Sequence, residues 1–84
     1  MNDLAVIIIT GTSLTLAFFV VGTTHTLHTD QKIRLRGLLW MAAALFTQMV
    51  MSILLHHTSN AYFHAAGVAF LLWAWWSRGG GDGL

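Results

Sequence analysis

The sequence predicts an all-α membrane protein with three transmembrane helices. Of its 84 residues, 56% are hydrophobic and only 8% are Asp, Glu, Lys or Arg, whereas about a quarter of the residues in a soluble domain are charged. The formal charges also leave two long stretches free, residues 4–24 and 37–77. None of these stretches carries a charged stripe that could face water, so a soluble three-helix core is not expected.

The first predicted transmembrane helix covers residues 4–24. At 1.5 Å per residue this segment would span roughly 31 Å, which matches the thickness of the bilayer hydrocarbon. A cleaved signal peptide is the main alternative, but signal peptides start with a basic region and have an apolar core of about 7–15 residues. The chain starts with Met1-Asn2-Asp3, which contains no base, and its apolar run is longer. We therefore expect an uncleaved membrane anchor.

The second uncharged stretch is about twice as long as a single span requires, and it is interrupted once, by His56-His57-Thr58-Ser59-Asn60. It predicts two helices, at residues 38–55 and 61–77, joined by a tight turn. Their lengths of roughly 27 and 25 Å are short for a bilayer and require anchoring residues at the helix ends. The glycine-rich tail at 79–84 is expected to be flexible, and residues 1–84 form one domain.

The basic residues predict how the helices are oriented. Lys32, Arg34 and Arg36 lie in the first predicted connection, and the second connection has no charged residue. The positive-inside rule therefore places the first connection and the C-terminus, next to Arg78, in the cytoplasm and the N-terminus outside. Trp is favoured at the headgroup level, and all four tryptophans fall at the same predicted interface: Trp40, Trp73, Trp75 and Trp76. The basic and tryptophan residues are the expected interfacial anchors.

Small and polar side chains at helical spacing predict the faces through which the helices associate. Inside lipid, helices are joined by close backbone approach and by polar side chains that seek partners. The expected packing or oligomerisation residues are Gly11, Thr15, Gln48, Ser52, Ala61, Ala65 and Ala69. These faces serve either to build the bundle within one chain or to join several chains.

Gln48 has the strongest requirement for a partner, because hydrocarbon cannot satisfy a carboxamide near the middle of a helix. The candidate partners are Gln48 of a neighbouring subunit and the hydroxyls of the first helix, at Thr12, Ser13 and Thr15. Such a bond is worth about 0.6–2 kcal/mol, so a structural role in setting register is favoured over a role in substrate binding.

The sequence offers little for catalysis or for metal binding. Cysteine is absent, and the carboxylates at Asp3, Asp30 and Asp82 all lie outside the predicted helices, so no enzyme is expected. Histidine is the commonest metal ligand, and His56 and His64 are the best candidates for a metal or haem site across the second turn. No thiol or carboxylate accompanies them, so no cofactor is expected. The net charge of +1 gives no footprint for nucleic acid.

Three closely spaced spans in 84 residues, with the N-terminus outside and the C-terminus inside, resemble the plan of the class I holins. These small phage proteins assemble into lethal holes in the inner membrane of a bacterial host. The segments 63–66 and 73–83 also resemble the ends of small membrane proteins from phages and mobile elements of high-GC bacteria. The chain departs from holins in having one Arg near its C-terminus instead of a basic cluster, and in lacking a second Met near its start.

Two functions are therefore expected. In the first, the chain is a non-enzymatic, holin-like pore former of the bacterial inner membrane that self-associates in the lipid bilayer. In the alternative, the same faces dock the chain onto a larger membrane complex as an accessory subunit, and the tryptophan cluster fixes its depth. Toxicity on induction favours the first function, and co-purification with a larger complex in a fixed ratio favours the second.

Overall fold

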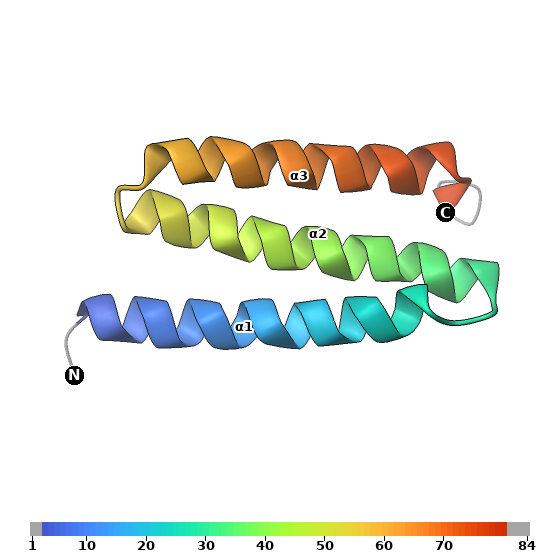
Figure 1. Cartoon of the computed structure of the whole chain (residues 1–84), viewed down its shortest axis with the longest axis horizontal. Coiled ribbons are helices and arrows are strands. Elements are labelled where there is room, and N and C mark those ends of the chain that lie inside the picture. The colour runs from blue at the N-terminus through green and yellow to red at the C-terminus, as the bar shows by residue number, and fades with distance from the viewer. Residues whose placement is uncertain (1–2, 81–84) are drawn as a thin grey trace.

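The computed structural model describes residues 3–80, which form three antiparallel α-helices (Figure 1). Helix α1 covers Asp3–Thr26, α2 covers Gln31–Leu54 and α3 covers Thr58–Ser77. The predictions of an all-α fold and of three helices are confirmed. Helix α2 lies between α1 and α3, which make no contact with each other. The described part of the chain is therefore an open row of helices, with α2 in the middle, and not a closed bundle.

Helix α1 extends two residues beyond its predicted end. Polar side chains of its last turn form hydrogen bonds with backbone carbonyls of the same helix. The Thr23 hydroxyl donates to the Phe19 carbonyl at 2.8 Å, and the Thr24 hydroxyl donates to the Val21 carbonyl at 2.8 Å. The His25 Nδ1 atom lies 2.7 Å from the same Val21 oxygen. These bonds allow the helix to continue through a polar segment that the sequence analysis assigned to the connection.

Helix α2 begins at Gln31, about two turns earlier than predicted. Asp30 is its N-cap, and the Asp30 carboxylate accepts a hydrogen bond from the Lys32 backbone N–H at 2.9 Å. This bond satisfies an amide that has no partner within the helix. The predicted basic connection is therefore the start of a helix, and the first two turns of α2 carry its three basic residues, Lys32, Arg34 and Arg36. The charged residues therefore mark the end of the apolar segment, but the helix itself continues through them to Gln31.

A Schellman motif forms the turn between α2 and α3. The backbone N–H of His56 donates to the Ile53 carbonyl at 3.1 Å, and the N–H of His57 donates to the Ser52 carbonyl at 2.7 Å. His56 has a φ of 62°, the left-handed conformation that this position requires and that glycine usually supplies. The chain reverses within three residues, and α3 begins at Thr58 instead of at the predicted residue 61.

Small residues form the interior of the helix row. The buried residues are Gly11, Gly22, Gly37, Ala42, Ala44, Ser52, Ala61 and Ala74. No large side chain is fully buried among the described residues. The large aliphatic and aromatic side chains lie instead on the outside. This distribution is the reverse of a soluble protein, in which Leu, Ile, Val and Phe fill the core.

Helices α1 and α2 are long and apolar enough to cross a membrane, whereas α3 is not. With 20 residues α3 has sufficient length, but its composition falls short because it starts with Thr58-Ser59-Asn60 and contains Tyr, Trp and His. The prediction of three transmembrane helices is thus supported by composition for two of them. Gly79, with a φ of 91°, follows Arg78, the C-cap of α3, and Gly80 lies against the Trp75 ring. The rest of the predicted tail, residues 81–84, lies outside the described residues.

Candidate functional site

The backbones of α1 and α2 lie in close contact at Gly22 and Gly37. A Cβ atom placed on Gly37 would lie 2.8 Å from the Gly22 carbonyl oxygen and 2.7 Å from the Thr26 backbone nitrogen. Since both neighbours are backbone atoms, a larger residue at position 37 requires the two helices to separate. Neither glycine of this pair is among the packing residues predicted from the sequence. Gly11 and Gly22 are three helical turns apart and so share a face, which is the signal that identifies Gly22.

The same face of α1 supplies the partner of Gln48. The Gln48 Nε2 atom donates to the Thr15 hydroxyl oxygen at 2.9 Å, and that hydroxyl donates to the Gly11 carbonyl at 2.7 Å. Gly11 itself leaves room for the Met51 side chain of α2. Of the partners considered for Gln48, the structure therefore gives Thr15 of the same chain.

We expect replacement of Gln48 to weaken the chain's own fold and not its association with other copies. Gln48→Leu should lower the free energy of unfolding in mixed micelles by about 0.6–2 kcal/mol, the range of hydrogen bonds between transmembrane helices. Thr15→Val removes the acceptor, and the double variant should cost less than the sum of the two single variants. Additive losses, or an altered oligomer distribution in Gln48→Leu alone, would contradict the intrachain bond.

The other predicted packing residues divide between buried and exposed positions. Ser52 is buried, and its hydroxyl donates to the Gln48 carbonyl at 2.9 Å. In α3, Ala61 is buried and Ala65 is half-buried, but Ala69 is exposed. A repeat of four residues rotates about 40° per step around a helix of 3.6 residues per turn, so the third alanine leaves the interface. Near the end of α3, Ala74 is buried again.

The predicted tryptophan anchors occupy two different environments. Trp40 lies in the third turn of α2, and its ring contacts those of Phe18 and His25 of α1, with centroid distances of 5.7 and 6.4 Å. Trp40 therefore contributes to the packing of α2 against α1. Trp73 and Trp76 are about two-thirds exposed on α3, at 64% and 65%.

The antiparallel arrangement gathers all basic side chains at one end of the molecule. The end of α1, the start of α2 and the end of α3 lie together (Figure 1). This end, which we call the basic end, carries all Lys and Arg residues of the chain: Lys32, Arg34, Arg36 and Arg78. The opposite end holds the start of α1 and the turn between α2 and α3. The Lys and Arg side chains are thus concentrated at one end of the row of helices.

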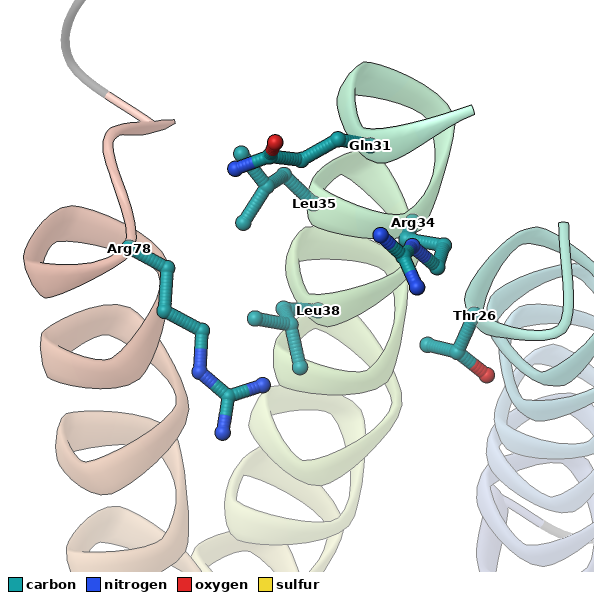
Figure 2. Close-up of a pocket in the computed structure, with 6 residues that line it drawn as sticks. All are labelled: Thr26, Gln31, Arg34, Leu35, Leu38 and Arg78. Atoms are coloured by element: carbon teal, nitrogen blue, oxygen red, sulfur yellow. The ribbon is translucent and has the colours of Figure 1, made fainter. Parts of the chain in front are cut away.

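A cleft of about 530 Å³ opens at the basic end between the helices. It is lined by Thr26, Gln31, Arg34, Leu35, Leu38 and Arg78 (Figure 2). Figure 2 shows Arg78 extending from the end of α3 toward α2, beside Leu38, and Arg34 extending from α2 on the side of α1. Among residues 3–80, the lining combines two cations with polar and apolar side chains and includes no carboxylate.

The outer face of α1, on the side away from α2, carries a row of small and hydroxyl residues. We define this row by its exposed members at spacings of four and seven residues, Ser13, Ala17 and Thr24. Thr10 is also exposed, but it lines a groove at the edge of the interface with α2. Thr24 donates to a carbonyl of its own helix, as do Thr15, Thr23 and Thr26. The hydroxyls of Thr10 and Ser13 make no hydrogen bond with any residue that the structure describes.

The histidines do not assemble into a metal centre within residues 3–80, which contain no group of three or more His, Cys, Asp or Glu able to hold an ion. The His64 Nδ1 atom lies 2.7 Å from the Asn60 carbonyl oxygen of its own helix. His56 is exposed in the turn between α2 and α3. The two candidates are therefore engaged in local backbone structure.

Comparisons of this chain with protein families, with curated proteins and with solved structures find no match. The features that bear on function are thus the helix-packing faces, the polarised charge and the exposed hydroxyls of α1.

Proposed function

We propose that this chain is an integral membrane protein that self-associates into a holin-like pore. Its large apolar surface supports the membrane location. Only 6% of the most apolar 18-residue window of α1 and 22% of that of α2 are buried. The core helix of a soluble protein is mostly buried, whereas a helix in lipid needs no such cover.

All three helices cross the membrane in this proposal, with the basic end in the cytoplasm. Helix α3 packs against α2 and runs antiparallel to it. If α2 spans the membrane, α3 therefore lies beside it within the bilayer. The 24 residues of α2 measure about 36 Å, several ångströms more than the hydrocarbon of a bilayer. The excess places the basic first turns of α2 among the headgroups.

The unsatisfied hydroxyls of α1 are the observation that carries self-association. A hydroxyl without a partner in hydrocarbon costs free energy, and neighbouring helices or water can supply the missing bond. Ser13 lies on the side of α1 away from α2, the helix that contacts α1 in the described part of the chain. Thr10 lies at the edge of the interface with α2, where it lines a groove together with Phe46 and Val50. The faces first expected to join subunits, at Gly11, Thr15 and Gln48, are occupied within the chain.

A pore follows if several copies turn the outer face of α1 toward one another. The hydroxyl of Ser13 would then face a water-filled centre, while the aliphatic and aromatic side chains of α3 remain in lipid. Small side chains at Ala17 and Thr24 would permit close approach of neighbouring α1 helices.

Controlled expression in a bacterial host tests this function. We expect the untagged chain to insert into the inner membrane and to cause abrupt depolarisation and loss of viability at a defined time after induction. The variant Ser13→Ala removes the outward hydroxyl with little change in volume and should delay or abolish depolarisation. Thr12→Val is the matched control, because Thr12 is also exposed but lies on a flank of α1 with bulky neighbours at Ile8 and Leu16.

Normal growth with stable membrane insertion would contradict pore formation. It would favour the accessory-subunit function, for which the outward aromatic face of α3 offers a docking surface. This face carries Tyr62, Phe63, Phe70, Trp73 and Trp76, each at least 63% exposed. Recovery of the chain in a fixed ratio with a larger complex in mild detergent would then identify the partner.

A further inference from the structure

The cleft at the basic end contains uncompensated charge. Arg34 and Arg78 line it from two helices, and neither forms an ion pair with any residue that the structure describes. An adjoining cleft of about 510 Å³ shares Gln31, Leu35 and Arg78 and adds Lys32, Gly79 and Asp30. The Asp30 carboxylate is already used to cap α2. Among the residues that the structure describes, three cations and one engaged carboxylate therefore line these two adjoining clefts.

We propose that this pair of clefts binds the phosphate of an anionic lipid headgroup. Guanidinium groups present several N–H donors in a fork that matches phosphate oxygens, and the Gln31 carboxamide adds a further donor. An anion bound between Arg34 and Arg78 would offset the repulsion between them. The volume of the first cleft lies within the range of roughly 300–1,000 Å³ that is usual for small-molecule sites.

The apolar part of the lining identifies the phosphate as that of a lipid. Leu35 and Leu38 lie one and two turns further into α2 than Gln31, on the cleft side. A lipid whose phosphate lies between the Arg34 and Arg78 side chains would therefore contact these leucine side chains. A free phosphate ion would leave those side chains uncovered. This inference rests on the proposed membrane location and does not depend on self-association or on a pore.

Lipid binding by the purified, delipidated protein in detergent tests the site. Native mass spectrometry should show tighter binding of phosphatidylglycerol than of phosphatidylcholine with the same acyl chains. Arg34→Gln and Arg78→Gln should each weaken phosphatidylglycerol binding by about fivefold, as expected for one basic residue at a charged membrane surface. Arg36→Gln removes the same charge from α2 but does not line either cleft, so it should leave binding nearly unchanged. Circular dichroism checks that each variant keeps its helices.

Three outcomes would overturn the site. Equal binding of the two lipids by the wild-type protein would remove the preference for an anion. An equal loss in Arg36→Gln would mean that diffuse charge attracts the lipid. Displacement of the lipid by inorganic phosphate at equal concentration would make a free anion the ligand. None of these outcomes depends on depolarisation or on oligomer number, so they are distinguishable from failure of the proposed pore.

Discussion

Gly37→Ala is expected to lower the free energy of unfolding by about 1–3 kcal/mol, the usual cost of adding a methyl group to a closely packed interior. The added Cβ would lie 2.7 Å from the Thr26 backbone nitrogen and 2.8 Å from the Gly22 carbonyl oxygen. Neither atom can move without moving α1. Alanine has a higher helix propensity than glycine, by up to about 1 kcal/mol. The net loss of unfolding free energy is therefore the cost of separating the two backbones minus this gain in helix propensity.

Gly67→Ala is the matched control for this substitution. The added Cβ at position 67 would lie 2.8 Å from Leu45 Cδ1, the far end of a flexible side chain. Leu45 can change its rotamer, so the helix-favouring effect of alanine should leave this variant as stable as the wild type or more stable. Denaturation in mixed micelles, followed by circular dichroism, compares the two. Equal stabilities of Gly37→Ala and Gly67→Ala would mean that α1 and α2 do not cross at Gly37.

The hydrophobic pattern of the sequence was sufficient to predict the number of helices and their approximate centres. A long uncharged segment that must form its backbone hydrogen bonds internally is expected to be helical, and the polar clusters between such segments separate one helix from the next. The helix ends were harder to predict because they depend on side-chain capping. Asp30 caps α2 far ahead of its apolar segment, and the histidine turn after Leu54 is closed by backbone bonds.

The site was predictable only in part. Gln48 and Thr15 were identified because a carboxamide in hydrocarbon must find a partner, and helical spacing limits the choice. Gly22 and Gly37 were missed because a close crossing of two helices depends on their relative position, which spacing within one helix does not determine. The pairing of Arg34 with Arg78 around one cleft likewise depends on the antiparallel arrangement of α2 and α3.

The location of the basic end predicts a large difference in chemical accessibility between the two ends of the molecule. The chain has no cysteine, so a single introduced cysteine reports one position. Thr29 lies in the turn at the basic end, Thr58 starts α3 at the opposite end and Ser77 ends α3, and all three residues are exposed. The four basic residues at one end favour a cytoplasmic position for Thr29 and Ser77.

Labelling these three single-cysteine variants in intact cells with a membrane-impermeant maleimide is the most direct test of a chain that crosses the membrane three times. We expect Thr58→Cys to be labelled in intact cells, and Thr29→Cys and Ser77→Cys to be labelled only after permeabilisation. Labelling of Thr58→Cys and Ser77→Cys from the same side would contradict a membrane-spanning α3. Labelling of Thr29→Cys in intact cells, with Thr58→Cys protected, would contradict a cytoplasmic basic end.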